Sequence, residues 1–169
     1  PADMQAMRQA MAELVTENTE IIASYESYDA ARIDYLHADE DGCNTLADRA
    51  ANTILADIGL VQRILHPQAL QARHNGNTIT IETDAAMLSG NDPAIFYVEI
   101  NSIPIAVNSV LCSGSKATLV LDSIIETGDT VRLWVGYGQM ATLNAANCVK
   151  DSISGYPLRS AANIIVNQA

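Results

Sequence analysis

The chain has 169 residues, of which 49% are hydrophobic, and its 20 acidic and 9 basic side chains give a net charge of −11. This length holds one ordinary domain or two small ones, and the apolar content favours a packed core over extended disorder. A strongly acidic chain repels phosphate backbones, so nucleic-acid binding is not among the expected functions.

Membrane insertion and export are not indicated either. No apolar run approaches the roughly 18 residues of a membrane span, and residues 1–25 lack the basic start and the apolar stretch of a signal peptide. The start Pro1–Ala2 fits a chain that has lost its initiator methionine, and equally a processed fragment. An odd number of cysteines without C-x-x-C spacing, at Cys43, Cys112 and Cys148, predicts free thiols in a reducing compartment.

The N-terminal residues carry an amphipathic helical pattern. Five apolar residues and one asparagine recur at alternating steps of three and four, which places them on one stripe of a helix. The stripe consists of Met4, Met7, Met11, Leu14, Asn18 and Ile21. Because a polar residue on such a seam can fix the register of a coiled coil, we predict self-association through these six residues. One helix of an intramolecular bundle explains the same pattern and stays open as the alternative.

Two more helices are predicted, a short one at residues 30–36 and a long one that starts at Asn44, a suitable N-cap, and ends before Pro67. The apolar positions of the long helix are Leu46, Ala50, Ile54, Ile58, Val61 and Leu65. Gly59 inside it suggests close helix packing. The acidic stretch 37–43 lacks the ligand spacing of an EF-hand, so we interpret it as a solvated turn rather than a metal site.

Beyond residues 73–77 the hydrophobic period changes from 3.6 to 2, which marks the predicted domain boundary. Strands are predicted at residues 78–83, 95–100, 103–107, 117–121, 130–137 and 164–166. Asn101–Ser102 and residues 126–129 have the composition of tight turns, and Trp134 is expected to face the core. This number of short strands is typical of an antiparallel β-sandwich.

The same half carries a family resemblance. Its motifs are the alternating strand 117–121, Thr127-Gly128-Asp129-Thr130-Val131, Lys150-Asp151-Ser152 with Gly155, and the closing Val166-Asn167. In order and spacing they resemble the bacterial Ig-like repeats of the cyanobacterial swimming-motility protein type. The chain departs from these repeats where Ser-Ile-Ser-Gly-Tyr-Pro replaces a compact Asp-Ala-Gly-Asn loop, and where the final Val-Asn lacks an intervening threonine. The resemblance covers residues 78–169 and implies an Ig-like module, such as those on bacterial surfaces and phage virions.

No catalytic, cofactor-binding or metal site is predicted, because the sequence has no Walker, G-x-G-x-x-G, H-E-x-x-H or G-x-S-x-G motif. The candidate nucleophiles and bases, none of which lies in a known catalytic motif, are Ser89, Ser113, Ser115, Cys112, His37, His66 and His74. Four carboxylates at loop ends could bind calcium, although exposed acidic turns are expected in so acidic a chain. They are Asp122, Glu126, Asp129 and Asp151.

The predicted fold class is therefore α+β, with a helical assembly region at residues 1–74 followed by an Ig-like antiparallel β-sandwich at residues 75–169. We predict a non-enzymatic structural protein of a phage particle, as a capsid decoration, neck or tail component, located in the virion after synthesis in the host cytoplasm. The predicted partners are other virion proteins and further copies of the chain, without nucleic acid, membrane or cofactor.

Two other functions remain open from the sequence. The first is a cell-surface adhesion or glycan-binding module, in which exposed aromatic rings stack on sugars. The candidate rings are Tyr97, Trp134, Tyr137 and Tyr156. The second is a fragment of an enzyme, since Ig-like modules also accompany hydrolases.

Overall fold

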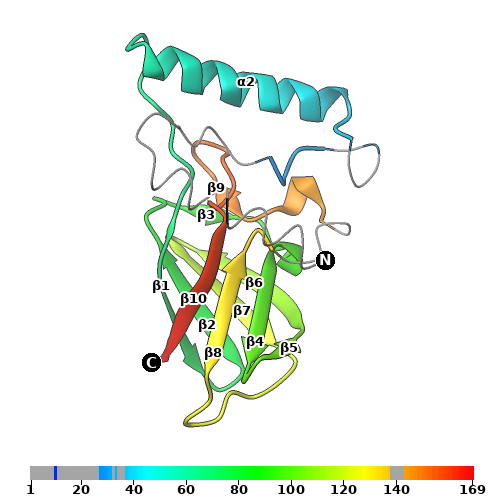
Figure 1. Ribbon diagram of the computed structural model, residues 1–169, viewed down its shortest axis with the longest axis vertical. Coiled ribbons are helices and arrows are strands. Elements are labelled where there is room, and N and C mark those ends of the chain that lie inside the picture. The colour runs from blue at the N-terminus through cyan, green and yellow to red at the C-terminus, as the bar shows by residue number, and fades with distance from the viewer. Residues whose placement is uncertain (1–9, 11–26, 32, 34–36, 138–142) are drawn as a thin grey trace.

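The computed structural model describes residues 10, 27–31, 33, 37–137 and 143–169. It shows a curled β-sheet with a helix lying across one end (Figure 1). The helix is α2 (Glu40–Asp57), and the strands are β1 (Ala69–Asn75), β2 (Thr78–Thr83), β3 (Leu88–Ser89), β4 (Phe96–Ile100), β5 (Ile103–Ile105), β6 (Val107–Ser113), β7 (Lys116–Leu121), β8 (Val131–Val135), β9 (Lys150–Asp151) and β10 (Ala161–Gln168). Two 3-10 turns, η1 (Pro93–Ile95) and η3 (Ala145–Asn147), complete the described elements.

The core lies inside the curled sheet, where alternate side chains of β2, β4, β7 and β8 are buried. Period-2 alternation puts every second residue of a strand on one face, and here that face carries Ile, Val and Leu side chains. Ile79, Val98, Leu119 and Leu133 are all 0% exposed. The opposite face carries polar side chains, including a cross-strand ion pair of 2.8 Å between Lys116 and Glu82.

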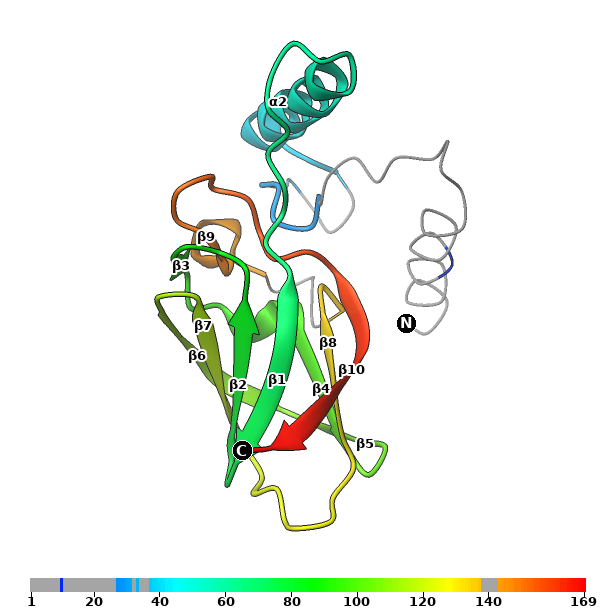
Figure 2. The same cartoon turned by 90° about the vertical axis from the view of Figure 1, so that its left-hand side faces the viewer.

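The strand order of the main sheet is β5-β4-β8-β10-β1-β2-β7-β6. Strand β1 pairs with β2 in antiparallel and with β10 in parallel orientation. The two outermost strands, β5 and β6, are consecutive in sequence and separated only by Ala106, so the sheet has to curl until its edges approach each other. Figure 2 shows the resulting nearly closed sheet, with β1 and β10 side by side. The short strands β3 and β9 form a separate pair near its upper end.

This architecture corrects the predicted fold class. An α+β chain with a helical N-terminal region and a wholly antiparallel Ig-like sandwich is wrong, because eight strands form one continuous sheet that includes a parallel pair. Within the described residues the chain is mostly β and has one α-helix. The reason for the error is that β1 hydrogen-bonds along both of its edges, a non-local pairing that hydrophobic periodicity cannot reveal.

All six predicted strand ranges are confirmed, since β2, β4, β5, β7, β8 and β10 contain or overlap them. The turn at Asn101 and Ser102 is confirmed as well, with φ values of 52° and 65° that a two-residue hairpin turn requires. Four strands were missed, namely β1, β3, β6 and β9. β1 has few apolar residues and was placed before the boundary, β6 begins at Val107, where the predicted strand at 103–107 was to end, and β3 and β9 have two residues each.

The long helix is shifted relative to its prediction. Its N-cap is Asp39, whose Oδ1 accepts a hydrogen bond of 2.8 Å from the Gly42 amide, and not Asn44. The acidic stretch interpreted as a turn therefore forms the first turn of α2, where Glu40 and Asp41 complement the helix dipole. Of the predicted short helix, the described residues 30, 31 and 33 are not helical.

The C-terminal end of α2 lies at Asp57, because Gly59 stops the helix instead of packing within it. Gly59 has φ = +77°, its amide donates to Ala56 O at 3.1 Å, and the Leu60 amide donates to Leu55 O at 2.9 Å. These two bonds form a Schellman motif, which satisfies the last carbonyls of a helix. Residues 58–61 consequently form a turn, and residues 62–65 follow without regular secondary structure.

Among the described residues, no helix is both long and apolar enough to cross a membrane. The residues predicted to mediate self-association, Met4, Met7, Met11, Leu14, Asn18 and Ile21, lie outside the described part of the chain.

Candidate interaction surface

Helix α2 is attached to the rest of the molecule through very few side chains. Only Gly42 and Arg49 of its residues are buried. Gly42 lies against the backbone of the preceding segment, where an added Cβ would be 2.1 Å from the Ala31 carbonyl oxygen. Glycine therefore permits a close backbone approach that no other residue would.

Arg49 forms a buried ion pair with Asp29, which precedes the helix. Its Nη1 and Nη2 atoms donate to Asp29 Oδ1 and Oδ2 at 2.6 and 2.7 Å, and the two side chains are 4% and 6% exposed. Burial opposes the charge of Arg49, but the hydrogen bonds and charge of Asp29 outweigh that effect and raise the pKa of Arg49. A bidentate, desolvated pair of this kind holds its two segments in a defined geometry.

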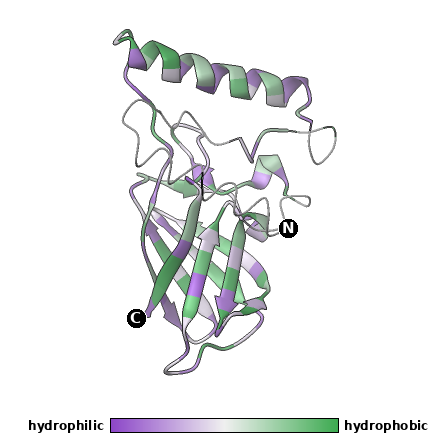
Figure 3. Cartoon of the chain, in the orientation of Figure 1, coloured by the Kyte–Doolittle hydropathy of each residue, from purple (hydrophilic) through white to green (hydrophobic). Residues whose placement is uncertain are grey.

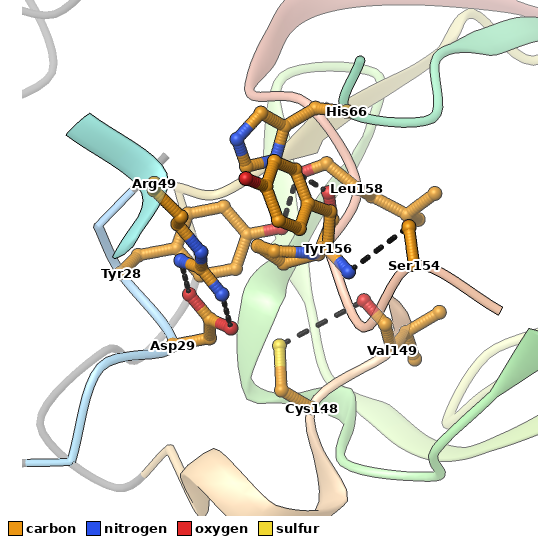
Figure 4. A network of polar contacts seen from close by, with 10 residues as sticks. Tyr28, Asp29, Arg49, His66, Cys148, Val149, Ser154, Tyr156 and Leu158 are labelled. Atoms are coloured by element: carbon orange, nitrogen blue, oxygen red, sulfur yellow. Dashed lines mark hydrogen bonds and ion pairs between the residues drawn. The ribbon is translucent and has the colours of Figure 1, made fainter. Parts of the chain in front are cut away.

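The ion pair lies against the loop that leads into β10 (Figure 4). The Arg49 guanidinium carbon is 5.2 Å from the centroid of the Tyr156 ring, and the His66 ring centroid is 4.7 Å from the same ring. His66 Nδ1 lies 3.0 Å from Pro157 O, and since a carbonyl only accepts, Nδ1 carries the proton. Tyr28 donates its hydroxyl hydrogen to Leu158 O. We call Tyr28, Asp29, Arg49, His66 and Tyr156 the polar junction.

The polar junction joins segments that are far apart in the sequence, because Tyr28 also belongs to the core of the curled sheet. Burial raises the pKa of the Tyr156 hydroxyl, with Arg49 acting in the opposite direction. Removing one partner of a buried ion pair leaves the other charge unpaired, which typically costs about 3–5 kcal/mol. The attachment of α2 therefore depends on charged and aromatic side chains rather than on an apolar helix face.

Ile54 and Leu55 at the end of α2, and the large apolar residues of the segment after it, are exposed instead. Across residues 54–65, large apolar side chains are between 37% and 70% exposed, namely Ile54, Leu55, Ile58, Leu60, Val61, Ile64 and Leu65. We call them the apolar surface. Figure 3 shows hydrophobic stretches on α2, which lies clear of the sheet. Exposed apolar groups gathered in this way mark interaction sites in proteins.

The side chain of Asn52 holds the segment after the helix against α2. Asn52 Oδ1 accepts a hydrogen bond of 3.0 Å from the Ile64 amide, and Asn52 Nδ2 donates to Gln62 O at 3.4 Å. Together with the Schellman motif, Asn52 fixes how residues 58–65 return along α2. The apolar surface is thus pre-organised, which lowers the entropic cost of binding.

The part of the apolar surface that follows the exposed Asp57 contains no carboxylate. From Ile58 to Ile81 the sequence has no Asp or Glu, although the chain as a whole carries 20. The first half of α2 is acidic by contrast, with Glu40, Asp41 and Asp48. A second chain of the same negative charge would meet the least repulsion at this acid-free stretch.

The four aromatic residues proposed for glycan stacking do not form one platform. Tyr97 and Trp134 pack edge to face on the outer face of the sheet, with ring centroids 5.2 Å apart, whereas Tyr137 is buried and Tyr156 belongs to the polar junction. The expectation that Trp134 faces the core is wrong, because β8 buries Val131, Leu133 and Val135 and turns Trp134 outward. Side chains on a strand alternate between the two faces of the sheet, so the burial of Leu133 and Val135 places Trp134 between them on the outer face.

The calcium candidates are similarly dispersed. In the part of the chain that the structure describes, no three His, Cys, Asp or Glu side chains are placed to hold a metal ion. Asp129 accepts from Asn101 Nδ2 at 2.7 Å and from the Glu126 amide at 2.8 Å, and Asp151 accepts from the Ser154 amide at 2.9 Å. These hydrogen bonds lower the pKa of Asp129, with the bond from the Glu126 amide contributing most. Both carboxylates act as turn-forming groups.

The nucleophile candidates lie apart as well. Cys43, Cys112 and Cys148 are free thiols. Burial raises the pKa of Cys112, and it raises the pKa of Cys148 to about 12, so neither thiol is activated at neutral pH. His66 lies in the polar junction, and His74 is buried on β1.

Two features of this surface had no sequence signal. Asp29 and Arg49 are separated by 20 residues and lie in no motif, so their pairing follows from tertiary structure alone. The exposure of residues 54–65 was hidden because their spacing matches that of an ordinary core-facing helix.

Comparisons with known proteins complete this description. No protein-family model matches the chain, and no curated protein is significantly similar to it. The resemblance of residues 78–169 to the bacterial Ig-like repeats therefore stays a prediction.

Among solved structures, the S-layer protein rSbsC(31–844) is 16% identical to the chain with a TM-score of 0.44 and covers 77% of it. Domains 1–6 of surface layer protein SbsC are 15% identical with the same TM-score of 0.44 and cover 80%. The chain spans only 17% and 18% of these two proteins. Likenesses this distant do not assign a function.

Proposed function

We propose that the chain is a non-enzymatic structural protein that acts through protein–protein contacts, with a second copy of itself bound on the apolar surface. The observation that carries this proposal is the exposure of the large apolar side chains across residues 54–65, at the end of helix α2 and in the segment after it, while the buried residues of α2 are Gly42 and Arg49 alone. Large apolar side chains that are gathered on a surface in contact with water are usually buried by binding another molecule.

The charge distribution favours a second copy as that molecule. Two chains of net charge −11 repel each other over most of their surface, but residues 58–81 contain no carboxylate. Apolar burial at this stretch gains about 25 cal/mol for each Å² removed from water and meets little opposing charge. The pre-organisation by Asn52 supports the same role.

Within this function, we propose a phage particle as the assembly, in which repeated copies make weak contacts sufficient. The support is the predicted resemblance of residues 78–169 to modules found on virions and bacterial surfaces. The curled sheet would then project from, or reinforce, a lattice that α2 helps to build. Other virion proteins are the further partners in this proposal.

Light scattering on the full chain over a range of concentrations tests the self-association. The variant Ile58→Ser/Leu60→Ser/Leu65→Ser should shift an oligomer to folded monomers, because three exposed apolar side chains are lost from the apolar surface. The matched control is Ile103→Ser/Ile124→Ser/Ile165→Ser, whose side chains are 63%, 65% and 60% exposed on the sheet and its loops. Circular dichroism verifies that both variants fold.

The control should retain the oligomer of the unmodified chain. A chain that is monomeric at every concentration would refute self-association, and equal weakening by both triple variants would show that the apolar surface has no particular role.

A further inference from the structure

An apolar surface needs an apolar counterpart on its partner, and the described residues offer one such counterpart. The other exposed large apolar side chains are scattered singly over different strands and loops. They are Ile33, Leu70, Met87, Ile103, Leu111, Ile124, Ile153 and Ile165. Single exposed apolar residues are normal on protein surfaces and do not form a docking site.

Two hollows in the described part of the chain do not fit an apolar side chain either. They lie at the end of the sheet away from α2, and His74 is among the lining residues of both. Their linings are mainly polar, with Asn75 and Thr127 in one and Asp129 and Arg132 in the other. A contact in which the apolar surface of one copy enters a pocket of the next therefore has no suitable pocket.

From this we infer that the apolar surface binds the same surface of a second copy, so that residues 58–65 of two chains meet across a two-fold axis. This inference rests on the proposed function and specifies the partner face. Such an interface is self-complementary. It gives a closed dimer, because each apolar surface is buried by the other and none remains free for a third copy.

The charges agree with this arrangement. Contact centred on residues 58–65 brings no carboxylate of that segment to the axis, whereas Glu40 and Asp41 lie at the other end of α2. The charged residues within the range of the apolar surface are Asp57 and Arg63, which are opposite in sign and can face each other across the two copies. A head-to-tail contact along the α2 helices would instead place the apolar surface of one copy on the acidic half of α2 of the next, burying Glu40, Asp41 or Asp48 without a partner. Burying unpaired carboxylates is strongly unfavourable.

Disulfide formation between identical positions tests the two-fold contact. Gln62 is exposed within the apolar surface, and Cys43 is exposed in the first half of α2. A cysteine at either position can therefore show whether that part of the chain lies close to a second copy. The test chain is Cys43→Ser/Cys112→Ser/Gln62→Cys, and the control is Cys112→Ser, which keeps Cys43. Under mild oxidation, the test chain should form roughly tenfold more covalent dimer than the control, because a disulfide needs Cα atoms closer than about 7 Å.

A third chain, Cys112→Ser/Gln62→Cys, separates the two arrangements. Links between two copies of residue 62 support the two-fold contact, and links between residue 62 and Cys43 of another copy would overturn it in favour of a head-to-tail contact. An oligomer without links at residue 62 would also overturn it, leaving self-association through another surface. A monomer in light scattering would instead refute the proposed function itself.

Discussion

The curled sheet and helix α2 are stabilised in different ways. The sheet buries alternate apolar side chains of four strands, with Ile79, Ile81, Leu133 and Val135 all 0% exposed. Helix α2 exposes Ile54 and Leu55 at its end, and it is attached by an ion pair, an aromatic ring and one glycine contact. A region that is held by a few specific contacts can be detached without unfolding the other, and its exposed apolar residues remain available to a partner.

The largest expected effect comes from Arg49→Ala. It leaves Asp29 buried and unpaired, which should cost about 3–5 kcal/mol for the attachment of α2. Hydrogen exchange followed by mass spectrometry should show α2 losing protection while β2 and β8 keep theirs. The double variant Asp29→Leu/Arg49→Met serves as the control, because it removes both charges and should restore most of the protection. Equal loss in the sheet would show that the two regions unfold as one unit.

A smaller effect is expected from Leu133→Ala in the centre of the sheet. Leu133 is 0% exposed, and removing its side chain should lower the free energy of unfolding by about 3 kcal/mol. Urea denaturation monitored by Trp134 fluorescence measures this change, since Trp134 is on the same strand. In contrast to Arg49→Ala, the protection of every sheet strand should fall together. A loss confined to β8 would contradict a cooperative sheet.

The smallest effect concerns Cys148, whose burial in the core of the sheet raises its pKa from the ordinary 9.0 to about 12. Because the folded pKa exceeds the unfolded one, this stabilisation is complete below pH 9 and is lost as the pH rises toward 12. Between pH 8 and pH 10 the unfolding free energy should fall by roughly 1 kcal/mol through this group. Urea denaturation at both pH values should show a smaller fall for Cys148→Ala, and an equal fall would refute the assignment.

How far the sequence anticipates the structure differs between the same two regions. Strands β2, β4 and β8 could be predicted because their alternation is a local property that burial inside the curled sheet enforces on every second residue. Strand β1 could not, since Ala69–Asn75 has little apolar alternation and is a strand because β2 and β10 pair with both its edges.

The helix was predicted in kind but not in extent or surroundings. Apolar spacing through Ile54, Ile58 and Leu65 is the same for a helix that faces a core and for a segment that faces a partner, so the sequence could not distinguish them. The Asp39 cap and the Gly59 stop are local signals that were outweighed by that spacing. The cap and the stop nevertheless set the ends of the helix, because they provide hydrogen bonds for backbone groups that a helix end otherwise leaves unsatisfied.

The sequence by itself therefore determined the acidic charge, the existence of α2 and the alternating strands, because composition, capping and periodicity act over a few residues. Only the tertiary structure decided that the strands close into one continuous sheet, that Asp29 meets Arg49 beside Tyr156, and that residues 54–65 face outward. These features depend on contacts between residues distant in sequence. Such contacts contribute to stability only after the chain has lost the entropy needed to bring the residues together, so short sequence patterns do not reveal them.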